Sequence, residues 1–222
     1  MLKRLTVLMV LAFLASTPSA FAQKVEISGT VGWTLSDGVE ATTPVLAPDG
    51  AIYDAVDLKD SFSWGLMGGY NVTEQVEVGF MWGQQLSRLD LEGTRLRELG
   101  DLTISTYHGY VGFNFFDVDA TARPYFFFGL GATNFGSVDF TNVLGQPRST
   151  GSETQFSTTW GAGVKVFGGG NVGARAGIQW TPTYIKSDPG GWWCDPYWGC
   201  YLVGDPQYAN QLTFGGGVIF RF

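Results

Sequence analysis

The sequence predicts an all-β protein whose strands form one eight-stranded, antiparallel, up-and-down transmembrane β-barrel. Apolar and polar residues alternate through eight segments, as expected for strands with one apolar face. The connections between these segments are alternately long and short, which is typical of membrane barrels. Hydrophobic residues make up 45% of the chain, and only 15% of residues are charged, against roughly 25% in ordinary soluble domains.

The first two predicted strands flank a long connection. Residues 24–35 alternate between apolar residues, such as Val25 and Trp33, and small or polar ones. Residues 36–59 contain two prolines and several turn-forming residues, so we expect a loop there. Residues 61–72 alternate again and form the second predicted strand.

The third and fourth strands are separated by a charged segment. A tight turn at 71–75 precedes the third strand, which alternates from Val76 to Trp82. Residues 84–100 either continue the flanking strands beyond the membrane or form a short helix. The fourth strand is predicted at 101–116.

The fifth strand interrupts the alternation. It is predicted at 123–136, after a short turn at 117–122, but residues 125–128 are a run of four aromatics. The pattern therefore does not indicate which of these rings face outward. A third long loop is predicted at 137–152.

The last three strands restore the alternation. The sixth spans 156–166 and the seventh 172–180, joined by a glycine-rich turn of residues that tolerate positive φ. A fourth long loop at 182–208 leads to the final strand, 211–222, which carries an apolar face and a small or polar face.

The N-terminus resembles a secretory signal peptide. Residues 1–22 contain two basic residues, a short apolar segment and an Ala-Phe-Ala cleavage motif, so cleavage is expected between Ala22 and Gln23. The alternative is a membrane anchor, but the apolar segment is short for a span. We therefore expect residues 23–222 to form a single barrel domain.

The charge balance excludes some partners. With 13 basic and 20 acidic residues, the formal net charge is −7, which argues against nucleic-acid binding. The sequence also lacks a polybasic patch for anionic lipid.

Three motifs carry a family resemblance. They are Ser-Trp-Gly-Leu-Met-Gly-Gly-Tyr at 63–70, Arg-Pro-Tyr-Phe-Phe-Phe-Gly-Leu-Gly at 123–131, and the terminal Phe-Arg-Phe. On the basis of these motifs, the chain resembles the small outer-membrane β-barrel family of the OmpA/OmpX kind, and the resemblance covers the whole mature chain. The resemblance implies a Gram-negative outer membrane, contact with its lipids, and assembly by the barrel-assembly machinery, which would read Phe220 and Phe222 as its signal.

Three charged residues fall on the strand faces opposite the apolar ones. Glu77, Lys165 and Arg175 are therefore expected to face the barrel interior. A Glu77–Arg175 pair there would be structural and would block the lumen. A proton or ion path is the alternative, although eight strands leave an interior just wide enough for side chains.

The fourth long loop contains both cysteines and a group of aromatics. In an exported chain with two cysteines in one loop we expect a Cys194–Cys200 disulfide, and free thiols are the alternative. A zinc site is disfavoured, because two thiolates with no nearby histidine do not complete it. The aromatic residues of this loop form either a surface patch for a glycan, lipid headgroup or protein, or an interfacial belt. They are Trp192, Trp193, Tyr197, Trp198 and Tyr201.

His108 is the single histidine. Some outer-membrane enzymes of this size that trim lipid A carry a His-x-Ser pair, but His108 precedes Gly109 and Tyr110, and Ser105 falls on the opposite strand face. No base–nucleophile pair is therefore predicted.

These observations favour a non-enzymatic barrel without metal or cofactor, whose extracellular loops have a structural or surface-interaction role. A narrow pore for ions or small solutes and a lipid-modifying enzyme are the alternative functions. A soluble barrel around an apolar ligand is the alternative architecture.

Overall fold

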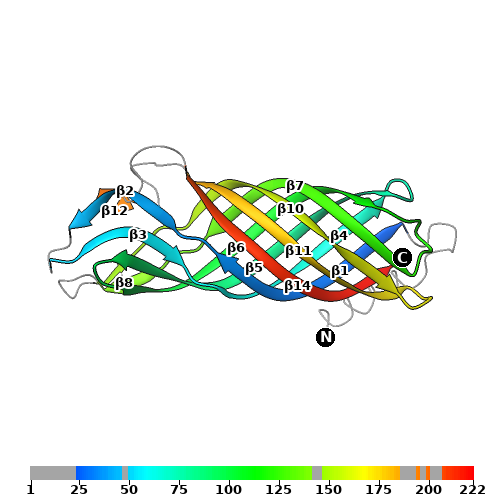
Figure 1. Ribbon diagram of the computed structural model, residues 1–222, viewed down its shortest axis with the longest axis horizontal. Helices are drawn as coiled ribbons and strands as arrows, with labels where there is room; N and C mark the ends of the chain where they lie inside the picture. The colour runs from blue at the N-terminus through cyan, green and yellow to red at the C-terminus, as the bar shows by residue number, and fades with distance from the viewer. Residues whose placement is uncertain (1–23, 47–49, 142–146, 186–193, 196–198, 201–206) are drawn as a thin grey trace, which may run out of the picture.

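The computed structural model describes residues 24–46, 50–141, 147–185, 194–195, 199–200 and 207–222. Eight long antiparallel strands form one barrel, and Figure 1 shows how they wind around it. They are β1 (Val25–Ser36), β4 (Ser61–Asn71), β5 (Val76–Gly93), β6 (Arg97–Asn114), β7 (Ala122–Phe135), β10 (Glu153–Phe167), β11 (Val172–Ile185) and β14 (Gln207–Arg221). Each pairs with its neighbours in this order, and β14 pairs with β1 to close the ring. The predicted eight-stranded barrel is confirmed.

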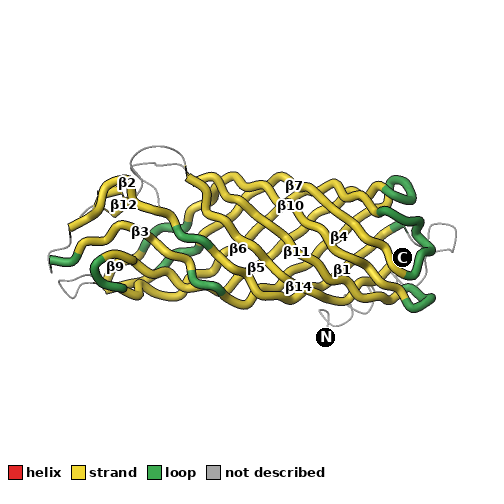
Figure 2. The backbone as a smooth tube through the Cα atoms, viewed as in Figure 1, coloured by secondary structure: helices red, strands yellow, loops and turns green. Residues whose placement is uncertain are grey.

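The two ends of the barrel differ. At one end, here called the turn end, short connections join β4 to β5, β6 to β7 and β10 to β11, and the C-terminus lies there (Figure 2). At the other, here called the extended end, strands continue well beyond the regular barrel.

The prediction of a loop at 36–59 is wrong. This segment forms a hairpin of β2 (Val39–Leu46) and β3 (Ile52–Leu58), and β3 pairs with β5. Among the described strands β2 pairs with β3 alone, and such an edge position tolerates Pro44. Register shifts in both pairings interrupt the alternation that would have revealed the hairpin.

The strands also extend into the other predicted loops. β5 and β6 run on as a paired ribbon, so the first alternative for residues 84–100 is confirmed. β11 and β14 pair as far as Ile185 and Gln207. Short pairs form between β8 (Asp139–Thr141) and β9 (Pro147–Ser149) and between β12 (Cys194–Asp195) and β13 (Gly199–Cys200). A tilted strand crosses a membrane with roughly 9–11 residues, so β5 and β6, at 18 residues each, extend beyond it.

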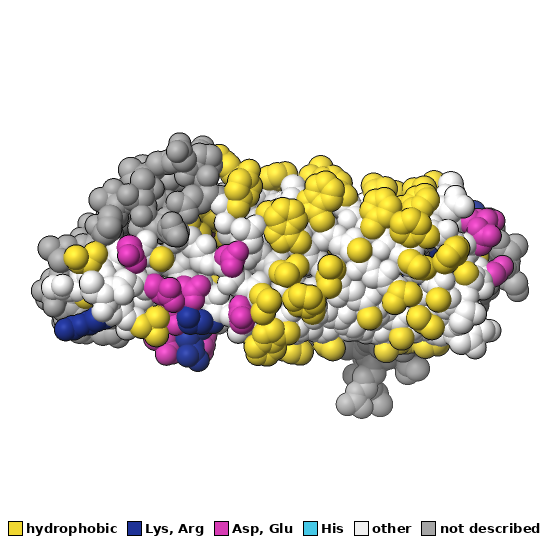
Figure 3. All heavy atoms as spheres, in the orientation of Figure 1, with side chains coloured by type: hydrophobic (Ala, Val, Ile, Leu, Met, Phe, Trp, Pro, Cys, Tyr) yellow, Lys and Arg dark blue, Asp and Glu magenta, His cyan; other side chains and the backbone are white. Residues whose placement is uncertain are grey.

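The outer wall of the barrel is apolar. Figure 3 shows hydrophobic side chains over its middle, with charged side chains gathered toward the two ends. Val31, Leu66, Phe80, Leu130 and Ile178 are each at least half exposed, although a soluble protein would bury many such residues. In the part of the chain described, no helix is long and apolar enough to span a membrane. The apolar wall is the surface expected to meet lipid.

The structure resolves the orientation of the aromatic run in β7. Tyr125 and Phe127 are buried inside the barrel, whereas Phe126 is exposed and Phe128 packs 4.3 Å from the ring of Trp160. Glycines on neighbouring strands provide the space for the inner rings. A Cβ on Gly161 would lie 2.4 Å from the ring of Phe127.

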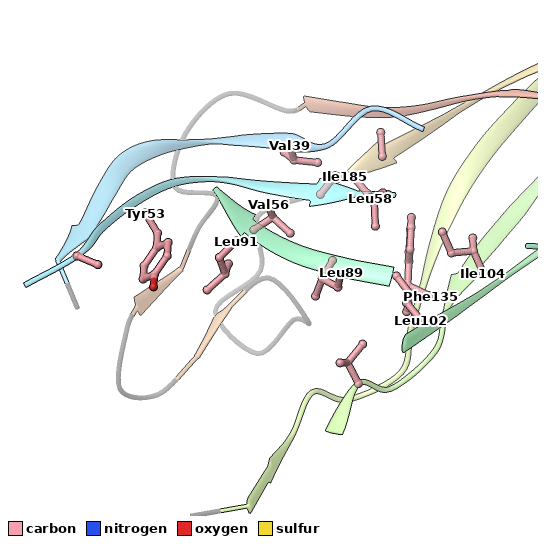
Figure 4. Close-up of a cluster of buried hydrophobic side chains, with 13 residues drawn as sticks. Val39, Tyr53, Val56, Leu58, Leu89, Leu91, Leu102, Ile104, Phe135 and Ile185 are labelled. Carbon is pink, nitrogen blue, oxygen red and sulfur yellow. The ribbon is translucent and has the colours of Figure 1, made fainter. Parts of the chain in front are cut away.

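The extended end has an apolar core of its own, shown in Figure 4. We call it the extension core. Its residues are all 3% exposed or less. They come from the β2–β3 hairpin, from the parts of β5, β6, β7, β11 and β14 at the extended end, and from Val138 between β7 and β8. They are Val39, Ala51, Tyr53, Val56, Leu58, Leu89, Leu91, Leu102, Ile104, Phe135, Val138, Ile185 and Ala209.

Candidate functional site

A layer of charged side chains fills the barrel interior near the turn end. Lys165 on β10 places its Nζ 2.5 Å from Glu26 Oε2 and 2.5 Å from Glu77 Oε2. Arg123 on β7 places Nη1 2.9 Å from Glu26 Oε1. These four residues, here called the charged layer, have side chains at most 6% exposed. Their alternating charges compensate one another in a region closed to solvent.

Arg175 occupies a different position from the one predicted. It does not pair directly with Glu77. Its Nη1 donates to Ser28 Oγ at 2.9 Å and its Nη2 to Tyr125 Oη at 2.8 Å. Glu77 is instead held by Lys165 and by the Tyr110 hydroxyl, 2.5 Å away. The predicted Glu77–Arg175 pair is therefore corrected to Glu77–Lys165.

Beyond Arg175, the interior contains a cavity of about 110 Å³. Arg175 and Tyr125 line it on the side of the charged layer, and Gln85 and Gln211 line it on the side of the extended end. Gln211 donates to Gln85 at 2.5 Å, and Gln85 in turn donates to the hydroxyls of neighbouring serines. The cavity therefore lies between a charged layer and an amide pair.

His108 has a hydroxyl partner after all. Its Nε2 lies 2.9 Å from Ser157 Oγ on β10, and the chain continues from Ser157 to Thr133 and Thr183 at 2.9 Å per step. The prediction that His108 has no hydroxyl partner is wrong, because Ser157 is 49 residues away in the sequence and reaches His108 only through the pairing of the strands. His108 and Ser157 are 0% and 1% exposed, and His108 Nδ1 has no partner in the described residues.

An ion-pair network lies at the extended end. Lys59 Nζ is 2.6 Å from Asp57 and 3.6 Å from both Asp90 and Glu92. The hydrogen bond to Asp57 raises the pKa of the Lys59 amine. Within the described segments, no group of three or more histidine, cysteine or acidic residues is arranged to hold a metal ion.

The remaining predicted residues are placed only in part. Phe220 is 44% exposed on the outer wall, and the backbone of Phe222 exchanges two hydrogen bonds with that of Val25. The backbones of Cys194 and Cys200 lie opposite each other in the β12–β13 pair. The five aromatic residues of this loop, the predicted cleavage site and residues 1–22 lie outside the described residues.

The sequence did not reveal the interior contacts of three residues, Glu26, Arg123 and Ser157. Glu26 stands on the polar face of the first strand, and Ser157 stands opposite the apolar face of the sixth, so alternation already placed both inside. Alternation does not reveal their partners, because these depend on the register between strands distant in sequence. For Arg123, the aromatic run that follows it obscured the strand face.

Comparisons with known proteins agree with this architecture. The sequence matches the family model of the outer membrane protein beta-barrel domain over residues 5–222. OprG of Pseudomonas aeruginosa superposes with a TM-score of 0.57 at 13% identity, covering 90% of this chain and 96% of that one. Neisserial surface protein A superposes with a TM-score of 0.54 at 14% identity, covering 90% and 99%. No curated protein sequence matches the chain.

Identities this low establish a shared fold and leave the biochemical role open. The family match covers nearly the whole chain, and the apolar outer wall is the surface that such proteins present to lipid. The chain therefore belongs to the outer membrane protein beta-barrel domain family and is an integral outer-membrane protein.

Proposed function

We propose that this protein is a non-enzymatic outer-membrane barrel that presents a folded extension outside the cell for surface interaction. The extension core carries this proposal. It buries 13 residues at the extended end, and each fully buried leucine or isoleucine contributes roughly 1.5–3 kcal/mol. Loops that served only as connections between strands would not need such a core. The short turns and the C-terminus would then face the periplasm, as in other barrels of this class.

The packing of the interior supports this role over a pore. The charged layer spans the interior from β1, β5, β7 and β10 with side chains that are almost fully buried. A water-filled path would expose these groups to solvent. The cavity on the other side of Arg175 has a volume of only about 110 Å³.

The His108–Ser157 pair also fits a structural role better than a catalytic one. A nucleophile must reach its substrate, and both residues are buried inside the barrel. No carboxylate in the described residues orients the His108 ring, since Nδ1 lacks a partner. The hydroxyl chain instead links β6, β7, β10 and β11 across the interior.

We further propose a disulfide between Cys194 and Cys200. Residues opposite each other in an antiparallel pair have Cα atoms roughly 4.5–5.5 Å apart, which falls within the range that a disulfide requires. The bond would fix the loop that carries the five aromatic residues. Labelling with a thiol-reactive polymer should add no mass before reduction and two labels after it. Labelling without reduction would exclude the bond.

Processing and assembly are expected to follow the family pattern. We propose that residues 1–22 are removed, which N-terminal sequencing of the membrane-bound protein tests. Phe222 adds a final pair of backbone hydrogen bonds where the last strand meets the first. Deleting Phe222 should lower the amount of heat-modifiable barrel in the outer membrane.

The surface role is tested with cells that display either the intact protein or a deletion of residues 190–201. Both are applied to a panel of immobilised glycans and proteins, and a heat-modifiability gel verifies that each barrel is folded. The proposal expects adhesion by the intact protein and its loss in the deletion variant. Absence of adhesion by intact cells, or equal adhesion by both, would contradict it.

A further inference from the structure

The cavity beside Arg175 combines a buried cation with neutral walls. We propose that it binds a small monovalent anion of halide size, held by the Arg175 guanidinium inside the barrel. The site is independent of the surface role proposed above.

The charge balance of the interior is the first argument. Arg123, Lys165 and Arg175 face two carboxylates, Glu26 and Glu77, and all five residues are at most 7% exposed. Both carboxylates are already within 2.9 Å of Arg123 or Lys165. Arg175 makes no ion pair within the described residues, although Glu77 lies close enough to attract it electrostatically. These five side chains together carry one more positive than negative charge.

The partners of Arg175 are the second argument. Ser28 and Tyr125 are both neutral acceptors, and the guanidinium carbon lies 4.9 Å from the centroid of the Tyr125 ring. A guanidinium has five N–H donors, and the structure shows two acceptors for those of Arg175, the hydroxyls of Ser28 and Tyr125. Tyr125 accepts from Arg175 and so retains its own O–H to donate to a ligand. A buried cation is costly unless an anion accompanies it.

The cavity itself supplies the third argument. Its walls carry hydroxyl and amide groups, including those of Thr30, Thr213 and Gln179. No carboxylate is among the lining residues. One water-sized group needs roughly 10–15 Å³, so about 110 Å³ accommodates a halide with several waters.

Bromide is a suitable probe, because its anomalous scattering locates it in a crystal. The protein is refolded and crystallised in sodium bromide, so that entry into the barrel interior does not limit binding. A bromide peak is expected in contact with the Arg175 guanidinium. Bromide at the outer surface alone, or no bromide at all, would overturn the proposal.

Two variants separate the anion site from general packing. Arg175→Gln removes the cation and should abolish the peak. Ser28→Asp retains Arg175 but places a carboxylate where Arg175 already donates at 2.9 Å, so this internal anion should also abolish the peak. Arg88→Gln, at an exposed arginine of the extended end, is the matched control and should retain it.

A heat-modifiability gel checks that each variant is folded. If Arg175→Gln does not fold, Ser28→Asp decides the question. Bromide that remains beside Arg175 in Ser28→Asp would overturn the proposal, because a compensated arginine should no longer hold an anion.

Discussion

Lys165 and Glu77, which lie 88 residues apart in the chain, meet inside the barrel with Nζ 2.5 Å from Oε2. The same amine is equally close to Glu26, so one lysine links β10 to both β1 and β5. Both carboxylates are almost completely buried, and their interior position depends on this cation.

Replacing Lys165 by Met should therefore destabilise the barrel. Breaking a buried ion pair from one side costs about 3–5 kcal/mol, because a charge is left buried without its partner. Urea unfolding in detergent micelles measures the loss. Glu77→Gln added to Lys165→Met should recover part of the stability, because Glu77 is the carboxylate left without a cation while Glu26 keeps Arg123 at 2.9 Å. A double variant as unstable as the single one would contradict this account.

Replacing Gly161 by Ala should destabilise the barrel through overcrowding. Its added Cβ would lie 2.4 Å from the ring of Phe127, and such overpacking costs about 1–3 kcal/mol. Gly168→Ala is the control, since no atom lies within 4 Å of its Cβ position. Urea unfolding of the two variants should separate them, and equal stability would show that Phe127 can move aside.

A charged residue in the middle of the outer wall should impair folding of the barrel into lipid. Leu66 is 51% exposed near the middle of β4, and an arginine at the midplane of a bilayer costs about 2–4 kcal/mol. Leu66→Arg should lower folding efficiency into lipid vesicles. Leu96→Arg, in the exposed β5–β6 turn, should leave it unchanged. Equal folding of both variants would argue against a lipid-facing wall at Leu66.

The extension should unfold separately from the barrel. Leu89 is 2% exposed in the extension core, and its replacement by Ala should remove about 2–5 kcal/mol of local stability. Limited proteolysis should then cut the extended end faster, while the heat-modifiable barrel persists. Leu96→Ala, at a residue 65% exposed, should not change the cleavage rate. Loss of the whole barrel in Leu89→Ala would show that the two parts unfold together.

The sequence predicted the parts of the fold that depend on local alternation. Strands such as β1 and β4 have one apolar and one polar face, so their presence and orientation follow from the residues alone. The β2–β3 hairpin escaped prediction because Pro44 and the register shifts break the period. In β7, both faces are aromatic, and only the neighbouring glycines determine that Phe127 points inward.

The interior partners depend on long-range register and could not be predicted in the same way. Alternation placed Glu77, Lys165 and Arg175 on interior faces, but the relative height of their strands decides which of them touch. Lys165 stands directly beside Arg175 in the β10–β11 pairing, and its side chain takes the position between the carboxylates. Arg175 then contacts Ser28 and Tyr125.

The most direct test of this account is the conductance of the purified protein in planar lipid bilayers, with a known porin reconstituted in parallel. The charged layer closes the interior, so the protein should produce no stable conductance steps while the porin does. Reproducible ion-conducting steps from the folded wild-type barrel would contradict the closed interior and favour the pore.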